Sequence, residues 1–324
     1  MGEPLLQVTD LRTYFMVGGP PVKAVDGVSL WVNENETLGL VGESGCGKSV
    51  TGLSILRLVP APGQIVGGKI LFKGRDIVSM KEKEVRKLRG KEISMILQDP
   101  QSSLNPLFTV GNQVGEALAI HTKLDKTGIM ARVIELLRLV RIAAPEQRTN
   151  DYPHQLSGGM KQRVGGAIAI SCQPILLIAD EPTTSLDVTI QLQYLELLKD
   201  LQKRFGMAMI FITHDFGIVA TICDRVAVMY AGKIVEMAST RDIFNHPTHH
   251  YTDALLKSVP KIEVDVDRLA SIPGQPPSGL GSSFLGCKFA PRCAKRSKKC
   301  VDEEPQLVTL HDGHSVRCWY PRES

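Results

Sequence analysis

The sequence predicts an α/β fold whose core is a mainly parallel sheet covered by helices on both faces. Two segments, residues 175–180 (ILLIAD) and 207–213 (MAMIFIT), are almost entirely apolar, as strands buried on both faces are. Such segments alternate with stretches of helical periodicity, which is the pattern of strand–helix units. With 324 residues, the chain can form one large domain plus an appendage, or two modest domains.

The first elements in chain order indicate β-structure. Residues 5–41 contain alternating apolar and polar positions around a Gly-Pro turn, and end in an apolar run before a glycine-rich loop. We expect a helix from Ser49 to Leu58 and a hairpin over residues 69–78 that turns at Gly74. Residues 81–93 are so highly charged that they predict a helix with a solvated face.

Helices dominate the middle of the chain. The remaining predicted elements are, in order, helices over 110–147, a loop at 149–158, a helix from Gly159 to about Ser171, a helix over roughly 188–205, and a hairpin around Gly232. With the two central strands, these segments complete the alternation that the α/β prediction requires.

The composition changes after Pro260, where Pro, Gly and Ser become frequent. We therefore predict a first domain of residues 1–260 and a loop-rich extension of residues 261–324 that carries four cysteines. Residues from about 100 to 165 are expected to form a helical subdomain of the first domain.

The charge balance excludes some classes of function. The net charge of +4 is accounted for by six basic side chains between Cys287 and Cys300, so the remainder is balanced and does not indicate a general nucleic-acid binder. Neither a secretory signal nor a run of about 18 apolar residues is recognisable. We expect a soluble, cytosolic protein that reaches a membrane only through a partner.

Residues Gly42 to Ser49 (GESGCGKS) match the phosphate-binding pattern G-x-x-x-x-G-K-[ST] between a strand and a helix. Glycines let successive backbone N–H groups point at phosphate oxygens, and the helix N-terminus adds favourable partial charge. Lys48 then reaches the β- and γ-phosphates, and the Ser49 hydroxyl binds Mg²⁺. Cys46 is most simply a small filling residue. A glycine turn without a ligand is the alternative.

Two acids, Asp180 and Glu181, follow a predicted buried strand. The first can hold Mg²⁺ through water, and the second can orient or deprotonate an attacking water. Acids often follow strands, so the pair is informative only together with the phosphate loop. The two motifs together predict hydrolysis of a nucleoside triphosphate.

A further anion site is indicated where Ser157 precedes two glycines at the start of a helix, in LSGGMKQR. A helix N-terminus with a serine cap and exposed N–H groups attracts negative charge. An ordinary capped helix is the alternative.

Five motifs occur in the order typical of the ATP-binding cassette (ABC) ATPases: the phosphate loop, LSGGMKQ, LIADEP, SLD (Ser185–Asp187) and ITHD (Ile212–Asp215). Gln98, in MILQDP, lies at the position of that family's Q-loop glutamine. The resemblance covers roughly residues 5–250. It implies an ABC-type P-loop ATPase domain with a parallel core sheet, an antiparallel β subdomain and a helical subdomain.

Longer stretches resemble the dipeptide and oligopeptide permease ATPases. They are VGESGCGKSVTGLSILRLVP, QDPQSSLNPLFTVGNQV, YPHQLSGGMKQRV, DEPTTSLDVTIQLQ and, in the C-terminal extension, HPTHHYTDALL, IPGQPPSG and CKFAPRC. The resemblance implies the ATP-hydrolysing subunit of an importer of di- and oligopeptides, with nickel or oligosaccharides as alternative cargo. A non-transport ABC ATPase is less favoured, because the chain has neither a long coiled-coil insertion nor a second cassette.

The resemblance also implies roles for the matched residues. Glu181 would be the general base, Gln98 would contact Mg²⁺ or the attacking water, and His214 would hold the γ-phosphate. Phe15 would stack on adenine, with Tyr14 as the alternative. The implied ATP contacts are Phe15, Gly42, Ser44, Gly45, Cys46, Gly47, Lys48, Ser49 and Val50. The implied Mg²⁺ contacts are Ser49, Gln98 and Asp180.

The resemblance further implies partners. The signature residues Ser157, Gly158, Gly159 and Gln162 would cap ATP bound by a second cassette, and Asp187 would link the two sites. That second cassette would be a paralogous ATPase subunit, or else another copy of this chain. Two transmembrane permease subunits and, indirectly, an extracytoplasmic substrate-binding protein complete the set, without nucleic acid. The chain would lie peripherally at the cytoplasmic face of the cell membrane.

Two departures from the family pattern are visible. Gly165 and Gly166 lie inside the signature helix, where each glycine costs about 1 kcal/mol relative to alanine. His250 stands where the family usually has proline. Neither position belongs to the predicted catalytic residues.

The four cysteines of the extension follow the spacing C-x5-C-x6-C-x17-C; they are Cys287, Cys293, Cys300 and Cys318. Structural zinc usually uses closer pairs, and a cytosolic location disfavours disulfides. A [4Fe–4S] cluster tolerates varied spacing, and nearby bases would offset its negative charge: Lys288, Arg292, Lys295, Arg296, Lys298 and Lys299. The resemblance to iron–sulfur-carrying importer ATPases favours this cluster. Zinc, free thiols, and a redox or nucleic-acid role for the extension stay open.

Overall fold

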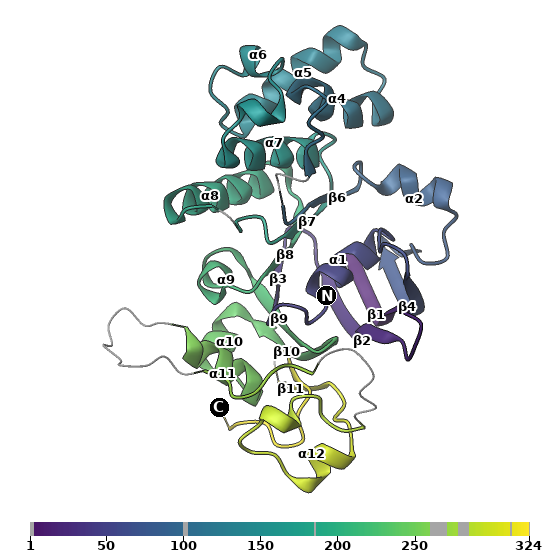
Figure 1. Ribbon diagram of the computed structural model, residues 1–324, viewed down its shortest axis with the longest axis vertical. Helices are drawn as coiled ribbons and strands as arrows, with labels where there is room; N and C mark the ends of the chain where they lie inside the picture. Colours follow the sequence, from purple (N-terminus) through teal and green to yellow (C-terminus); the bar gives the residue numbers. More distant parts are fainter. Residues whose placement is uncertain are drawn as a thin grey trace. The chain divides into compact units, whose positions relative to one another are not determined.

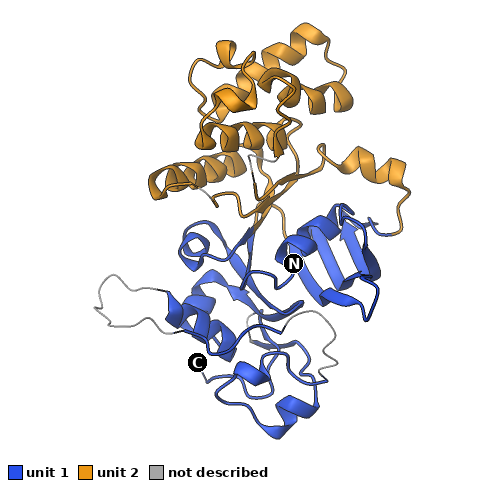
Figure 2. Cartoon of the chain, in the orientation of Figure 1, with its two compact units in different colours: residues 1–32, 37–78, 212–324 blue, residues 33–36, 79–211 orange. Residues whose placement is uncertain are grey.

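In the computed structural model, the described residues are 3–99, 103–184, 186–259, 271–277, 285–311 and 313–323. The chain divides into two compact units (Figure 2). Unit 1 comprises Met1–Val32, Thr37–Val78 and Ile212–Ser324, and unit 2 comprises Asn33–Glu36 and Ser79–Phe211. Both units combine strands with helices, which confirms the predicted α/β class (Figure 1).

The antiparallel β subdomain lies in unit 1. Its strands, in spatial order, are β2 (Val22–Val32), β1 (Leu6–Phe15), β4 (Gly63–Phe72) and β5 (Arg75–Asp76). All adjacent pairs run antiparallel. Along β1, Leu6, Val8 and Leu11 are buried, and the residues between them are exposed. One face of this sheet therefore packs against the protein interior, and the other faces solvent. Helix α1 (Lys48–Ile55) contacts β1 and β2.

Unit 1 also contributes a second run of strands, in the order β11 (Val308–His311), β12 (His314–Val316), β10 (Lys233–Ser239), β9 (Arg225–Tyr230) and β3 (Thr37–Val41). The pair β3 and β9 is parallel, and the other three pairs are antiparallel. The hairpin predicted around Gly232 is thus confirmed as β9–β10. This unit also holds α9 (Phe216–Ile222), α10 (Thr240–Asn245) and α11 (His250–Ser258).

The C-terminal extension joins this sheet through β12, which pairs with β10. A buried polar group fastens the pairing: the carboxylate of Glu236 on β10 accepts hydrogen bonds from the Thr248 backbone at 2.6 Å and from Nε2 of His314 on β12 at 2.7 Å. The extension also contains the short helices η2 (Ala290–Arg292) and α12 (Lys298–Asp302). Sequence reasoning missed β11 and β12, although Gly313 is a turn signal between them.

Unit 2 contains the other central strands, in the order β8, β7 (Leu176–Asp180) and β6 (Ile93–Ile96); β8 (Ala208–Thr213) belongs to this unit up to Phe211. Strands β6 and β7 are parallel, and every residue of β7 is buried. The charged stretch predicted as a helix is α2 (Glu82–Leu88). Of that helix, only Val85 and Leu88 are buried.

The remaining helices of unit 2 are α4 (Val110–His121), α5 (Lys126–Leu139), α6 (Pro145–Arg148), η1 (Pro153–Gln155), α7 (Gly158–Ile170) and α8 (Val188–Phe205). Helices α4, α5 and α7 pack on one another (Figure 1). The packing buries Val114, Leu118, Val133 and Leu136 completely or nearly so. The helices predicted over 110–147 are therefore present; residues 100–102, where the predicted subdomain begins, lie outside the described residues.

Side-chain caps set where several helices begin. Thr109, Asp125, Ser157, Asp187 and Asp215 each accept a hydrogen bond from a backbone N–H in the first turn of α4, α5, α7, α8 and α9, respectively. Two of these caps, Ser157 and Asp187, are also predicted site residues.

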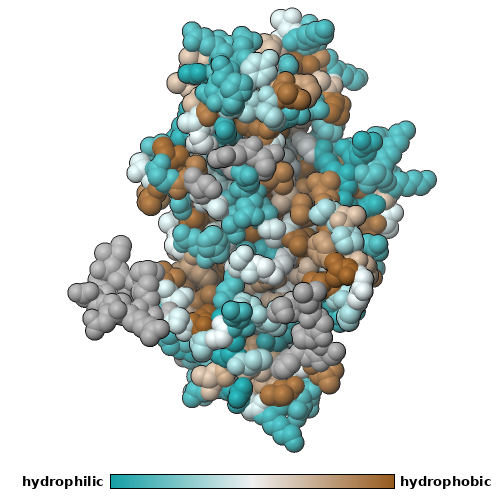
Figure 3. All heavy atoms as spheres, viewed as in Figure 1, coloured by the Kyte–Doolittle hydropathy of each residue, from teal (hydrophilic) through white to brown (hydrophobic). Residues whose placement is uncertain are grey.

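Polar and apolar residues are interspersed over the face of the molecule drawn in Figure 3. Among the residues that the structure describes, none of the helices is both long and apolar enough to span a bilayer.

Candidate nucleotide-binding and hydrolysis site

The phosphate loop lies between β3 and α1, the strand–loop–helix setting that its motif requires. Lys48 is nearly buried, and its ammonium donates to the carbonyl oxygens of Gly42 at 2.8 Å and Glu43 at 3.0 Å. Gly42 and Gly47 both have positive φ, and a Cβ there would collide with the carbonyl oxygens of Met229 and Ala24, respectively. The loop therefore requires glycine at both positions.

Cys46 has a packing role inside this loop. Its side chain is 5% exposed, and its Sγ lies 2.9 Å from the point where a Cβ on Gly42 would be. Burial raises the pKa of the Cys46 thiol, so the sulfur is protonated at neutral pH and is no thiolate nucleophile. The other predicted contacts differ in exposure: Ser44 and Gly45 are exposed, and Ser49 and Val50 are half-buried in the first turn of α1.

The two aromatic candidates for adenine lie next to each other on β1, and their surroundings differ. The Tyr14 hydroxyl donates to the Asp26 carboxylate at 2.7 Å. Burial and that carboxylate raise the pKa of Tyr14 to about 12. The Phe15 ring packs instead on Gly63, 2.8 Å from the point where a Cβ on that glycine would be. Because Tyr14 is engaged in a polar network, Phe15 stays the predicted adenine contact.

His214 directly follows β8 and is exposed. Asp215 next to it caps α9 by accepting hydrogen bonds from Gly217 N at 2.7 Å and Ile218 N at 3.4 Å. The histidine thus lies between the end of the buried strand β8 and the start of the capped helix α9. These two elements hold its backbone in place, and its side chain is exposed.

In unit 2, Gln98 and Glu181 come together although 83 residues separate them. Gln98 Nε2 donates to Glu181 Oε2 at 3.1 Å, and the Thr184 hydroxyl donates to the same oxygen at 3.1 Å. Glu181 has a φ of 43°, a left-handed conformation that costs a non-glycine residue energy and is frequent at functional sites. Asp180, the last residue of β7, is 4% exposed.

The predicted signature residues lie around the start of α7. Ser157 caps this helix by accepting from Met160 N at 3.3 Å, and both Ser157 and Gly158 are exposed. A Cβ on Gly159 would lie 3.1 Å from Ile190. Gln162 differs from the others, because it is 1% exposed and its carboxamide atoms have no hydrogen-bond partner among the described residues. The helix start therefore offers the hydroxyl and the glycine N–H groups to an anion.

The neighbouring D-loop candidate, Asp187, is exposed and caps α8 by accepting from Ile190 N at 3.0 Å. Ser185, predicted with it in SLD, lies outside the described residues.

Both departures from the family pattern have a structural context. A Cβ on Gly166 would lie 3.0 Å from the buried Tyr194 hydroxyl, so this glycine permits close packing of α7 and α8. At Gly165 nothing lies within 4 Å of an added Cβ, and nothing in the structure explains the glycine. His250 begins α11, and its Nε2 lies 2.9 Å from the Tyr320 carbonyl oxygen of the extension.

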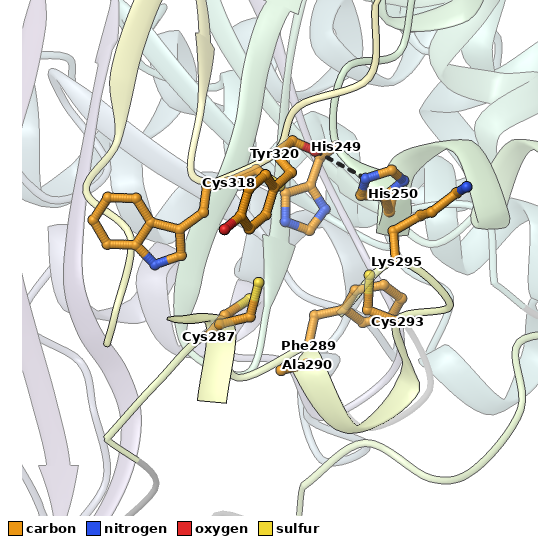
Figure 4. A pocket seen from close by; sticks show the side chains of 11 residues that line it. His249, His250, Cys287, Phe289, Ala290, Cys293, Lys295, Cys318 and Tyr320 are labelled. Atoms are coloured by element: carbon orange, nitrogen blue, oxygen red, sulfur yellow. Dashed lines mark hydrogen bonds between the residues drawn. The ribbon is translucent and has the colours of Figure 1, made fainter. Parts of the chain in front are cut away.

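All four cysteines of the extension line one cavity in unit 1 (Figure 4). The cavity is also lined by His249, His250, Phe289, Ala290, Lys295, Trp319 and Tyr320. None of the chain's seven cysteines forms a disulfide. Burial raises the pKa of the Cys287, Cys293 and Cys318 thiols, the last to about 11.

His249 supplies a hydrogen-bond donor to this cavity. Its Nδ1 accepts from the Tyr251 backbone N–H at 3.0 Å, so in the neutral ring the proton is on Nε2. Burial and the neighbouring His250 lower the pKa of His249 to about 4, which keeps the ring neutral. A hydrogen bond with the Arg317 backbone raises that pKa, but burial outweighs it. Figure 4 shows the ring projecting toward the space flanked by Cys287 and Cys293.

The sequence predicted that six basic residues around the cysteines would offset the charge of a cluster. Three of them contact other side chains in the structure. Lys288 pairs with Asp26 at 3.1 Å, and Arg292 pairs with Glu43 at 2.7 Å. Lys299 lies over the Trp319 ring at 3.7 Å. Of the six, Lys295 lines the cavity.

Comparisons with known proteins agree with this fold and these motifs. The "ABC transporter" family profile matches residues 25–184, and the profile "Oligopeptide/dipeptide transporter, C-terminal region" matches residues 235–300. A dimeric ATP-binding cassette solved in a post-hydrolysis state with ADP and Pi superposes with a TM-score of 0.66 at 26% identity, covering 73% of this chain and 99% of that one. The protein cbiO1 from Clostridium perfringens gives 0.64 at 28% identity, with 76% and 92% covered.

Similarity to curated proteins extends over nearly the whole chain. A probable peptide ABC transporter ATP-binding protein of Sinorhizobium fredii is 51% identical over 98% of this chain and 96% of its own length. The dipeptide transport ATP-binding protein DppD of Bacillus subtilis is 48% identical over 98% and 95%.

The fold, the family profile and the matching solved cassettes therefore define an ABC ATPase, which couples ATP hydrolysis to transport. More narrowly, the chain belongs to the ATP-binding subunits of the oligopeptide/dipeptide ABC transporters.

Proposed function

We propose that this chain binds and hydrolyses ATP to drive the uptake of di- and oligopeptides through partner membrane subunits. The observation that carries the proposal is the full-length similarity to peptide-transport ATPases, which includes the C-terminal region specific to them. Division into a cassette of residues 1–260 and an extension of residues 261–324 belongs to the same proposal.

The chemistry assigned to each residue follows from its position. Lys48 and the N–H groups of the phosphate loop hold the β- and γ-phosphates, and Phe15 contacts adenine. Glu181 accepts the proton of the attacking water, while Gln98, within hydrogen-bond distance of that carboxylate, orients the water. His214 holds the γ-phosphate. Mg²⁺, when bound, supplies positive charge to the phosphate oxygens, with Ser49, Gln98 and Asp180 as its proposed contacts.

A second cassette completes the assembly. The exposed Ser157 and Gly158 at the start of α7 are proposed to cap the nucleotide of a partner ATPase, together with Gly159 and Gln162, and Asp187 to link the two sites. The partner is a paralogous ATPase or a second copy. Two permease subunits hold the pair at the cytoplasmic face of the membrane, and a binding protein delivers the peptide.

The assembly and its cargo are tested together. A tagged chain is purified from detergent-solubilised membranes of its host, and the captured complex is reconstituted into liposomes with its binding protein. We expect two transmembrane subunits to co-purify and ATP-dependent uptake of a labelled tripeptide. Capture without membrane subunits, or uptake of nickel or an oligosaccharide in place of the peptide, would contradict the proposal.

Glu181→Gln tests the role of the general base. Loss of a positioned base reduces turnover by roughly 10²–10⁴-fold, whereas affinity for ATP should persist because the phosphate loop is intact. The matched control is Glu196→Gln, an exposed glutamate on α8 in the same unit, which should leave turnover unchanged. Equal turnover in E181Q and E196Q would remove Glu181 from the mechanism.

We also propose that the four-cysteine cavity holds a [4Fe–4S] cluster. The fit rests on four cysteine side chains that line one cavity together with the neutral His249 ring, whose N–H group can donate to a cluster sulfur. The described residues contain no group of three metal-ligating side chains close enough for a single ion. Zinc-bound thiolates share one ion at about 2.3 Å, whereas each thiolate of a cluster binds a different iron.

Anaerobic purification with metal analysis and an absorption spectrum tests the cluster. We expect about four irons per chain and a broad absorption band at about 400 nm. Cys287→Ser should lower the iron content, while Cys172→Ser, a cysteine outside the cavity, should not. Stoichiometric zinc without colour, or metal-free protein with four titratable thiols in the extension, would exclude it.

A further inference from the structure

Arg292 of the extension reaches into the phosphate loop. Its side chain is 5% exposed, and its guanidinium holds both carboxylate oxygens of Glu43: Nη1 lies 2.7 Å from Oε2, and Nη2 lies 3.0 Å from Oε1. Nε donates to the Pro273 carbonyl at 3.0 Å. This two-point geometry is the strong form of an arginine–carboxylate pair, because both groups are planar and oriented.

Glu43 is the second residue of the phosphate loop, and three groups fix it. Arg292 holds its carboxylate, and its backbone N–H donates to the Tyr251 hydroxyl at 3.0 Å. Its carbonyl oxygen accepts from the Lys48 ammonium at 3.0 Å. Displacement of Glu43 would therefore also displace Lys48, the lysine that meets the phosphates.

Aromatic packing keeps Arg292 in place. The rings of Tyr230 and Tyr251 have centroids 4.6 Å apart, and Phe289 packs on both at 5.3 Å. Arg292 lies against Tyr230, with Nη1 3.4 Å from the hydroxyl oxygen. Because these rings are buried, the guanidinium has little freedom to leave Glu43.

The charge of Glu43 matters because this loop binds a polyanion. A carboxylate without a cation would repel the nucleotide phosphates and would compete with them for Lys48. Arg292 neutralises this carboxylate and keeps it away from the lysine.

We propose that Arg292 is a positioning residue for nucleotide binding, by which the C-terminal extension neutralises Glu43 and holds the phosphate loop. The proposal rests on the ATPase function and does not depend on what the cysteines bind.

A double-mutant cycle of charge-neutralising substitutions in the full-length chain tests it, with the Kd for a fluorescent ATP analogue and Mg²⁺ as the readout. Arg292→Gln should raise Kd roughly tenfold or more, as expected when one partner of a partly buried charge pair is removed. Turnover at saturating ATP should change little, because Arg292 does not touch the reacting atoms. The variant E43Q/R292Q should recover to within about threefold of wild type, since the unpaired carboxylate is gone.

Arg296→Gln is the matched control. It removes the same charge from an exposed position of the same segment and should leave Kd unchanged. Melting temperatures of all variants report folding separately from binding. If R292Q does not fold, the cycle is run with R292K, for which a smaller rise in Kd and recovery by E43Q are expected.

Three outcomes would overturn the proposal: an unchanged Kd in R292Q, an unchanged Kd in R292K, or a double variant as weak as the single one. Failure of the ATPase function looks different. In that case wild type itself would not bind the analogue, and Lys48→Ala would have no effect.

Discussion

At the scale of single residues, several predicted site residues have backbone conformations that are energetically unfavourable or that only glycine can adopt. Glu181 has an unfavourable left-handed φ of 43°, and its carboxylate accepts hydrogen bonds from Gln98 and Thr184. Gly42 and Gly47 have conformations and surroundings that admit no side chain. The signature helix contains a contrast of another kind, because Gly165 and Gly166 are adjacent and only Gly166 has a packing reason.

This contrast predicts opposite effects of the two alanine substitutions. Gly165→Ala should raise the free energy of unfolding by about 1 kcal/mol, since alanine is the better helix former and nothing lies within 4 Å of the added Cβ. Gly166→Ala should lower it by roughly 1 kcal/mol, because the Cβ would press on the Tyr194 hydroxyl, which donates to the Gln162 carbonyl at 3.3 Å. Urea unfolding of both variants measures the difference. Equal effects would show that Tyr194 imposes no constraint.

At the scale of elements, polar contacts join strands that lie far apart in the sequence. Asp26 on β2 accepts from Tyr14 on β1 at 2.7 Å and pairs with Lys288 of the extension and Lys233 of β10, at 3.1 and 3.6 Å. Burial alone would raise the pKa of Asp26. The Tyr14 hydroxyl and the two lysines outweigh burial and lower that pKa to about 2.

The Asp26 contacts predict a pH-dependent stability. The folded pKa lies below the unfolded value of 3.8, so the stabilisation is complete above about pH 4 and is lost as the pH falls toward 2. At pH 7, Asp26→Asn should lower the free energy of unfolding by roughly 2 kcal/mol. The gap to wild type should shrink between pH 4 and pH 2. Urea unfolding at several pH values measures both quantities.

The matched control for this prediction is Asp10→Asn. Asp10 forms an ion pair with Arg12 at 3.0 Å, but its side chain is 56% exposed, so its loss should cost little at any pH. A gap between D26N and wild type that stays constant from pH 7 to pH 2.5 would contradict the assignment to Asp26.

At the scale of the whole molecule, the described residues of the extension are part of unit 1. The extension supplies β12 to the sheet, Lys288 to Asp26 and Arg292 to the phosphate loop. Its removal would leave the fully buried Glu236 without His314 and would leave Glu43 without Arg292.

A chain truncated after Val259 should therefore be markedly destabilised, by several kcal/mol, or should aggregate. Calorimetric melting and light scattering measure this. The control is the full-length chain cleaved at a protease site introduced at residues 261–270, in which the extension should remain bound and the melting temperature should be close to that of the uncleaved protein. A truncated chain as stable as wild type would show that the extension folds and acts independently.

The sequence by itself determined the fold class, the phosphate loop, the acids after β7 and the capped start of α7. Each is a local pattern, in which residues a few positions apart dictate conformation, so it can be read without knowing distant contacts. Strands β6, β11 and β12 were missed, because short strands carry little periodicity of their own and depend on pairing with neighbouring strands.

Only the tertiary structure decided which distant residues meet. It joined Gln98 to Glu181, Lys288 to Asp26 across 262 positions, and Arg292 to Glu43 across 249 positions. It also placed the four cysteines around one cavity with His249. The physical reason is that an arginine pairs with any acid that packing brings within reach, and no local pattern encodes which one that is. From the sequence, the basic residues beside the cysteines were expected to offset the charge of a cluster. In the fold, two of them form ion pairs elsewhere: Lys288 with Asp26 and Arg292 with Glu43.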